Sequence, residues 1–156
     1  MEQKSLPRFQ DIPPFRPTCT DGYVVKVVDG DTVHFAFFDE WAQGFVRICC
    51  RLSGLDTAEL HSKDPEEKEA AQAAKQHLNE LIQDEPLCVE LEPRADKYGR
   101  WLATFRRSRD QLNINEAMLA SWAVPYDGKK KAKIDWGLKL RSNRQDVSQG
   151  GGEALE

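Results

Sequence analysis

The sequence predicts an α+β fold that is mainly β, a closed five-stranded barrel with two helices packed against it. Five short segments rich in β-branched and aromatic residues are separated by turn signals. One long helical segment lies between the third and the fourth of them, Pro65–Ile82. A single inserted helix favours a small barrel over an alternating βαβ sheet. The OB-fold is the barrel of this kind, and OB-folds bind nucleic-acid chains on their strand face and loops.

Size and composition describe one soluble domain. The chain has 156 residues, 40% of them hydrophobic and 31% charged, with a net charge of −4. No apolar run approaches the ~20 residues of a membrane span, and the first fifteen residues lack the apolar core of a secretory signal. We therefore expect a cytoplasmic monomer, although a trimmed precursor stays open. The cysteines have no zinc-ligand spacing and are expected to be free thiols (Cys19, Cys49, Cys50, Cys88).

The N-terminal half is predicted to hold an arm and three strands. Residues 1–20 contain four prolines and little periodicity, which indicates an extended arm. Tyr23–Val28 and Val33–Phe38 are β-rich segments joined by the Asp-Gly turn of D-G-D-T, residues 29–32. Phe45–Leu55 alternates apolar and polar residues, which predicts the third strand.

The C-terminal half is predicted to hold two helices, two strands and a tail. Pro65–Ile82 begins with proline and acidic residues and carries an apolar stripe at helical spacing, so it is expected to pack on the barrel. Leu87–Leu91 and Trp101–Phe105 are predicted strands, and Asn113–Trp122 is the second predicted helix. We expect the domain to span 21–137, followed by a flexible tail over 138–156, where the charge is high and glycines cluster.

The stretch R-L-S-G-L-D-T-A-E, residues 51–59, carries the most chemistry. It places a guanidinium, two carboxylates and a threonine within nine residues at the end of the third strand. Arginine binds phosphate oxygens in a fork geometry, and two carboxylates beside a turn suit a hard, oxygen-seeking cation. Arg51 shares its strand face with Arg47, so the pattern leaves two candidates for any arginine role.

Three stretches in order make a specific set, although each alone is a good surface turn. They are D-G-D-T at 29–32, R-L-S-G-L-D-T-A-E at 51–59 and D-K-Y-G-R at 96–100. With a helix between the second and the third, the chain resembles the staphylococcal nuclease-like (thermonuclease) family over roughly Tyr23 to Tyr126. The resemblance implies an OB-fold barrel with packed helices and a calcium-dependent nuclease. Such an enzyme would cleave DNA and RNA, preferably single-stranded, and leave 3′-phosphate ends.

The resemblance also implies roles for the metal ligands and the base. Asp31 and Asp56 match the two carboxylate ligands of Ca²⁺, and Thr57 matches the residue that offers its backbone carbonyl. Glu59 matches the glutamate that positions and deprotonates the attacking water. The set fits Ca²⁺ because every ligand is a hard oxygen.

Five further positions match residues that hold the substrate. Arg51 and Arg100 match the two arginines that clamp the phosphate, where such donors stabilise transition-state charge. Lys97 and Tyr98 match residues that contact a terminal phosphate, and Tyr126 is the best match to a nucleotide-packing tyrosine.

Two departures from the family pattern keep alternatives open. Ala58 stands where the family usually has proline, so the turn that carries Glu59 is expected to be less rigid. The chain after Tyr126 looks too short for the family's C-terminal helix. The alternatives are a catalytically weak or silent nucleic-acid-binding barrel and a protein-interaction module that uses the arm and the tail.

Overall fold

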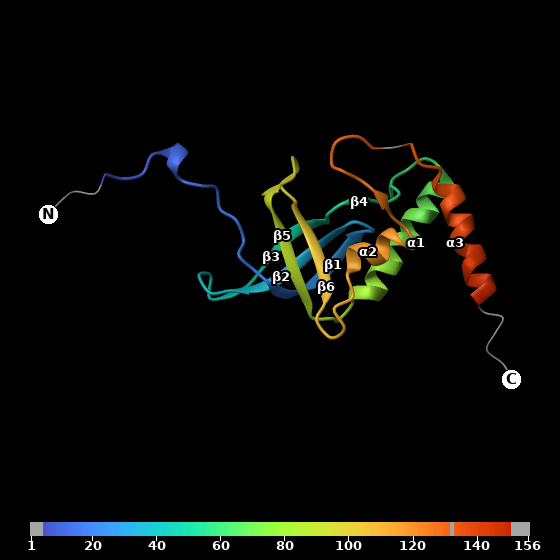
Figure 1. Ribbon diagram of the computed structural model, residues 1–156, viewed down its shortest axis with the longest axis horizontal. Coiled ribbons are helices and arrows are strands. Elements are labelled where there is room, and N and C mark those ends of the chain that lie inside the picture. The colour runs from blue at the N-terminus through green and yellow to red at the C-terminus, as the bar shows by residue number, and fades with distance from the viewer. Residues whose placement is uncertain (1–4, 132, 151–156) are drawn as a thin grey trace.

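The computed structural model describes residues 5–131 and 133–150 and confirms the predicted barrel. Five strands close in the order β1-β2-β3-β6-β5 (Figure 1). β3 and β6 pair in parallel, and the other barrel pairs are antiparallel. The strands are β1 (Asp21–Asp29), β2 (Thr32–Asp39), β3 (Gly44–Leu52), β5 (Leu87–Ala95) and β6 (Trp101–Arg107).

The predicted third strand is divided in two. β3 ends at Leu52, and a separate short strand, β4 (Leu55–Asp56), pairs with β7 (Val124–Pro125) in a second, two-stranded sheet. The division falls at Gly54, whose φ of +82° turns the chain out of the barrel. This turn directs the acidic end of R-L-S-G-L-D-T-A-E away from the barrel and toward the helices.

Three helices pack at one end of the barrel, as Figure 1 shows. They are α1 (Pro65–Ile82), α2 (Ile114–Leu119) and α3 (Trp136–Gly150). Asp64 caps α1 by accepting the N–H of Glu66, and α1 buries its alanine and leucine stripe against the barrel core. The N-terminal arm runs away from the barrel and contains the short 3₁₀ turn η1 (Phe9–Asp11). No helix in the described ranges has the length and apolarity that crossing a membrane requires.

The third helix corrects the sequence prediction. The flexible tail was expected over 138–156, whereas α3 runs to Gly150, and residues 151–156 lie outside the described ranges. α3 presents two buried apolar side chains, Trp136 and Leu140, to α1. Arg141 and Arg144 also form ion pairs with Glu66 and Glu69 of α1. The described side chains of α3 thus contact residues far away in sequence, and such contacts leave little local signal.

Strand register brings the three motifs together. Thr32 of β2 pairs with Arg51 of β3, so D-G-D-T lies beside the arginine. Arg51 in turn pairs in parallel with Leu102 of β6, which brings D-K-Y-G-R to the same end of the barrel. The β4–β7 pair, together with a hydrogen bond from the N–H of Tyr126 to the carbonyl of Gly54 (3.0 Å), adds the segment after β7.

Candidate active site

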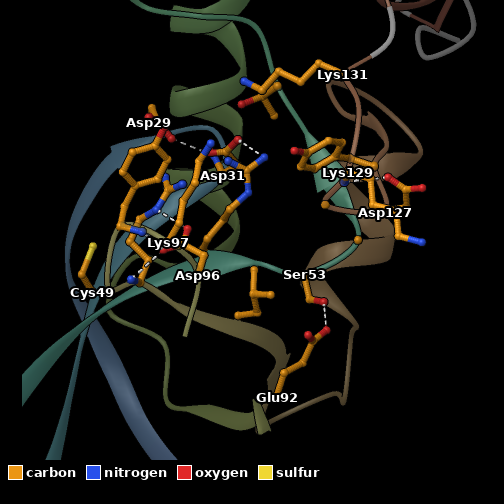
Figure 2. A pocket seen from close by; sticks show the side chains of 18 of the residues that line it. Asp29, Asp31, Cys49, Ser53, Glu92, Asp96, Lys97, Asp127, Lys129 and Lys131 are labelled. Atoms are coloured by element: carbon orange, nitrogen blue, oxygen red, sulfur yellow. Dashed lines mark hydrogen bonds and ion pairs between the residues drawn. The ribbon is translucent and has the colours of Figure 1, made fainter. Parts of the chain in front are cut away.

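A cavity of about 1040 Å³ opens at the barrel end where the motifs meet (Figure 2). Eight of the nine residues singled out from the sequence line it, and Asp56 lies behind them against Arg51 and Lys131. The lining predicted residues are Asp31, Arg51, Thr57, Glu59, Lys97, Tyr98, Arg100 and Tyr126. Arg47, the competing arginine, is exposed on β3 and is not among the lining residues, so the structure favours Arg51.

Asp31 is held in the tight turn between β1 and β2. Its N–H donates to the carboxylate of Asp29 (3.0 Å), and its own carboxylate accepts the Thr32 hydroxyl (2.8 Å). Gly30 allows the turn to approach α1, since a Cβ there would lie 2.8 Å from Cβ of Ala74. The turn chemistry of D-G-D-T therefore fixes the direction of the Asp31 carboxylate.

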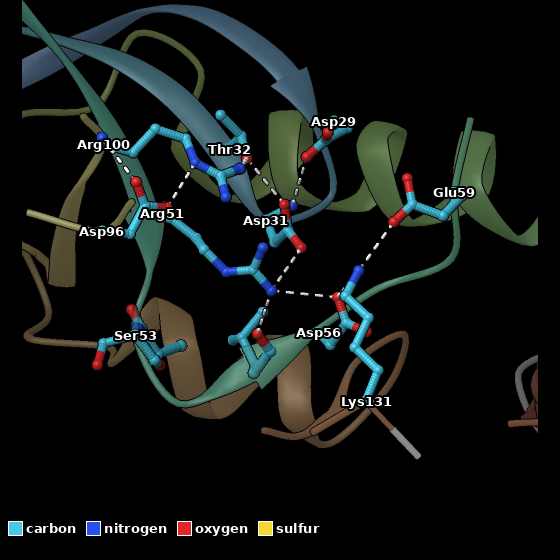
Figure 3. A network of polar contacts seen from close by, with 12 residues as sticks. Asp29, Asp31, Thr32, Arg51, Ser53, Asp56, Glu59, Asp96, Arg100 and Lys131 are labelled. Atoms are coloured by element: carbon cyan, nitrogen blue, oxygen red, sulfur yellow. Dashed lines mark hydrogen bonds and ion pairs between the residues drawn. The ribbon is translucent and has the colours of Figure 1, made fainter. Parts of the chain in front are cut away.

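Arg51 joins the two predicted metal-ligand carboxylates. One guanidinium nitrogen lies 3.4 Å from Asp31 Oδ2 and 3.1 Å from Asp56 Oδ1, and it donates to the Leu55 carbonyl at 3.2 Å (Figure 3). The ring of Tyr126 covers the guanidinium at 5.2 Å. Only 8% of Arg51 is exposed. The two carboxylates and the Tyr126 ring bury the guanidinium.

Asp31 carries an unusual charge environment. Burial, followed by the hydrogen bond and the charge of Asp29, raises the pKa of Asp31 to about 6, and the opposing effects of Arg51 and Thr32 do not cancel this rise. Two carboxylates close together in a buried turn favour a neighbouring positive charge. A second positive charge, in addition to that of Arg51, would stabilise the ionised carboxylate of Asp31.

Asp96 organises the turn between β5 and β6. Its carboxylate accepts the backbone N–H groups of Tyr98 and Arg100 (both 2.9 Å) and the Arg100 Nε (2.8 Å). Partial burial acts to raise the pKa of Asp96, but these hydrogen bonds and the Arg100 charge outweigh it and lower the pKa. Arg100 also donates to the Thr32 hydroxyl at 3.3 Å, and its guanidinium lies 5.3 Å from the Tyr98 ring. The predicted second arginine is thereby oriented toward the Asp31 turn (Figure 3).

Glu59 stands at the outer edge of the network with 61% of its side chain exposed. Lys131, which the sequence analysis did not single out, donates to Glu59 Oε1 at 3.0 Å and lies 3.6 Å from Asp56 Oδ1. Burial acts to lower the pKa of Lys131, but the hydrogen bond to Glu59 and the two carboxylate charges raise it. Glu59 is therefore an accessible carboxylate that a lysine neutralises.

The sequence of this chain is similar to that of a known protein family. The family model described as staphylococcal nuclease homologue matches residues 49–135, more than half of the chain. The chain belongs to the staphylococcal nuclease homologue family. Among curated proteins, it is similar to an uncharacterized protein of Methanocaldococcus jannaschii, with 32% identity over 63% of this chain. The chain spans 55% of that relative's length.

The family match does not cover two elements of this staphylococcal nuclease homologue that bear on the site, the D-G-D-T turn and helix α3. D-G-D-T precedes residue 49, so Asp31 enters the site through the β2–β3 register and not through the matched segment. α3 begins at residue 136, directly after the matched region. The N-terminal strands and the last helix thus complete a site whose centre the family model covers.

Ala58 is anchored by packing. A looser turn was expected where the family usually has proline, but Ala58 is buried in a small cluster with Ala70 and Ala71 of α1 and Trp136 and Leu140 of α3. The chain after Tyr126 was expected to be too short for a C-terminal helix, yet it forms α3, which belongs to the same cluster as the residue that precedes Glu59. The alanine methyl fits this contact between two helices.

Four residues missed in the sequence support the site. Asp29 and Asp96 belong to the quoted motifs, and their turn-forming carboxylates were a usable signal. Asn115 is buried and bonds the Phe105 N–H and the carbonyls of Ala103 and Ser53, which fixes the β3–β4 turn. Lys131 lies in a basic run that is visible in the sequence, but only the fold brings it to Glu59.

The oxygen donors present fit a hard divalent cation. Asp31 and Asp56 both approach the same guanidinium nitrogen, and the buried Thr57 follows Asp56 directly. Among the described residues, no group of three or more His, Cys, Asp or Glu side chains is gathered around one point. Two carboxylates, a carbonyl and water suit Ca²⁺, which accepts six to eight oxygen ligands in flexible geometry.

Proposed function

We propose that this family member is a Ca²⁺-dependent nuclease that hydrolyses phosphodiester bonds of DNA and RNA, preferably single-stranded, with little sequence specificity. The observation that carries the proposal is the meeting of Asp31 and Asp56 at Arg51, beside a cavity that Arg100 and Glu59 also line. Carboxylates for a cation, arginines for a phosphate and a spare carboxylate are the parts that phosphodiester hydrolysis requires.

Asp31 and Asp56, with the Thr57 carbonyl, would hold the ion. Bound Ca²⁺ supplies positive charge beside the scissile phosphate. The raised pKa of Asp31 supports this assignment, since a carboxylate that is costly to ionise beside Asp29 gains from a second cation. Asp31 and Asp56 would then have two positive partners, the ion and Arg51.

Arg51 and Arg100 would hold the phosphate. Each guanidinium is oriented by a carboxylate, Arg51 by Asp31 and Asp56, and Arg100 by Asp96. Charge grows on the phosphate's equatorial oxygens in the transition state, and one such pre-oriented donor contributes about 10²–10³-fold in rate. Tyr98, Lys97 and Tyr126 line the same cavity and would contact the neighbouring nucleotides.

Glu59 would take a proton from the attacking water. Its exposed carboxylate lies near the proposed ligand Asp56, because one ammonium group, that of Lys131, reaches both side chains. The 5′-oxygen would then be expelled and take a proton from solvent, which leaves a 3′-phosphate end, and Glu59 would release its own proton to solvent.

A nucleic-acid-binding module without strong catalysis is the second candidate. The observation that favours it is the pairing of Glu59 with Lys131, which occupies one carboxylate oxygen of the proposed base. In that case the cavity would bind a strand through its arginines and lysines with strong salt dependence.

Degradation of single-stranded DNA by the purified protein, with Ca²⁺ and with a chelator, tests the proposal. We expect cleavage that chelator abolishes, with 3′-phosphate ends identified by mass spectrometry. Glu59→Gln should keep the fold and lower kcat by about 10²–10⁴-fold. Glu90→Gln, at an exposed position of β5, is the matched control and should keep full activity. Binding without cleavage in the wild-type protein would select the second candidate.

A further inference from the structure

The ammonium group of Lys131 lies within ion-pair distance of the carboxylates of Asp56 and Glu59. It reaches toward Asp56 and Glu59 from the segment between β7 and α3 (Figure 3), and Lys129 and Lys131 of this segment line the cavity. This segment is shaped by Gly128, with φ of +84°, and by Asp127, which accepts the N–H of Lys129 at 2.9 Å. The side chain of Lys131 is 49% exposed, so solvent reaches it from one side.

The ammonium group lies where two functions of the site overlap. It is 3.0 Å from Glu59, the proposed base, and 3.6 Å from the Asp56 oxygen that also accepts Arg51. A divalent cation bound to Asp56 would bring its two charges close to this ammonium group. Like charges at such separations repel strongly outside bulk water, so the lysine and the ion cannot both hold these carboxylates.

We propose that Lys131 is a built-in counter-ion that competes with the divalent cation for Asp56 and Glu59. This inference rests on the proposed function. In the absence of metal, Lys131 neutralises the two carboxylates. When the cation binds, Lys131 moves away and Glu59 becomes free to accept a proton. The displaced ammonium group remains on the cavity wall beside Lys129, where it meets a phosphate of the nucleic-acid backbone.

This arrangement couples metal binding to substrate binding. Before metal binds, the positive charge of Lys131 is committed to the protein's own carboxylates. After metal binds, the same charge is available to the substrate. Each phosphate that a cation neutralises steepens the dependence of single-strand affinity on salt by about 0.7 in the logarithmic slope.

Calorimetric titration of Ca²⁺ into wild-type protein and Lys131→Met, at 0.1 M salt and without nucleic acid, tests the competition. We expect Lys131→Met to bind Ca²⁺ about 3–10-fold more tightly, the range of a partly exposed ion pair. Lys130→Met removes the same charge from an exposed position of the same segment and should stay within about twofold of wild type. Unchanged or weaker Ca²⁺ binding by Lys131→Met, or equal gains in both variants, would overturn the proposal.

A second measurement follows the displaced lysine. The salt dependence of affinity for a cleavage-resistant phosphorothioate oligonucleotide is compared with and without Ca²⁺. We expect Lys131→Met to reduce the slope by about 0.7 in Ca²⁺ and to leave it unchanged in chelator. A reduction of equal size in both conditions would refute release by metal. If wild type binds and cleaves but these differences are missing, the competition alone fails. If no variant binds Ca²⁺, the proposed function fails with it.

Discussion

Individual carboxylates of the site change the stability of the fold in opposite directions. Burial and the neighbouring Asp29 make the ionised form of Asp31 unfavourable and raise its pKa to about 6. Such perturbed groups gather where a protein binds or reacts. Asp96 behaves in the opposite way, since its hydrogen bonds favour the ionised form and lower its pKa.

Asp31→Asn should separate stability from metal binding. At pH 7.5 without metal, we expect the free energy of unfolding to rise by about 1–2 kcal/mol, because the raised pKa of Asp31 makes the fold lose stability as pH rises from about 4, where the unfolded chain ionises, to about 6, and the full cost remains above that value. Ca²⁺ affinity should fall more than tenfold with one anionic ligand gone. Urea unfolding and calorimetry check the two effects. An unchanged calcium titration would remove Asp31 from the ligand set.

Asp96→Asn should lower stability in a pH-dependent way. The folded pKa of Asp96 lies below its ordinary value, so its ionised form stabilises the fold above about pH 4, and this contribution is lost as pH falls through the folded pKa. We expect a loss of about 1 kcal/mol at pH 7 and a smaller loss near pH 3. Urea unfolding at both pH values measures it, and an equal loss at both would contradict the assignment.

At the scale of elements, α3 supports the loop that carries the proposed base. Trp136 and Leu140 pack on Ala58, and Glu59 follows directly in the chain. The segment between β7 and α3 also delivers Lys131 to the same loop. The last helix therefore acts on the site through packing and through the connection that precedes it.

Trp136→Ala should weaken both the fold and the site. Trp136 is 9% exposed, and its removal opens a cavity beside Ala58, so we expect a loss of about 2–4 kcal/mol in urea unfolding. If the proposed function holds, kcat should fall at temperatures where the variant remains folded, because Glu59 loses its support. Leu138→Ala is the control on the same helix, since Leu138 is 60% exposed and should change stability by less than about 0.5 kcal/mol. Full activity in folded Trp136→Ala would show that α3 does not position Glu59.

The whole molecule depends on closure of the barrel. β1 pairs with β2 along its length, and its ladder with β5 runs through Asp21 and Gly22, which face Cys88 and Leu87. At this point β1 also lies tightly against β2, because a Cβ on Gly22 would lie 2.1 Å from the Ala36 carbonyl and 2.6 Å from the Phe35 ring. Closure holds β2 and β6 on either side of β3, which is the arrangement that brings the three motifs together.

Gly22→Ala should destabilise the barrel strongly. The added methyl meets backbone and a buried ring that cannot move independently, so we expect a loss of at least about 2 kcal/mol in the free energy of unfolding. Gly44→Ala makes the same change at a strand position where a Cβ meets nothing within 4 Å, and it should be neutral within about 0.5 kcal/mol. Urea unfolding compares the two, and equal stabilities would show that the close contact between Gly22 and β2 tolerates a methyl group.

Local patterns in the sequence determined the five barrel strands, α1 and the turn chemistry, whereas the residues of the candidate site came from the family resemblance. Alternation and helical spacing predict elements from neighbours in the chain, and D-G-D-T and D-K-Y-G-R formed the turns that such residues favour. The family resemblance, which the family match supports, added the grouping of the three motifs. Their roles in binding and catalysis stay predictions.

Tertiary structure alone decided the burial of Arg51, the existence of α3, the packing of Ala58 and the place of Lys131. Each depends on contacts between residues far apart in sequence: Tyr126 over Arg51, Trp136 on Ala58, and Lys131 on Glu59. Periodicity within one segment carries no information about such partners. A mostly polar helix such as α3, or a lysine in a basic loop, acquires its role only when the fold supplies the surface it meets.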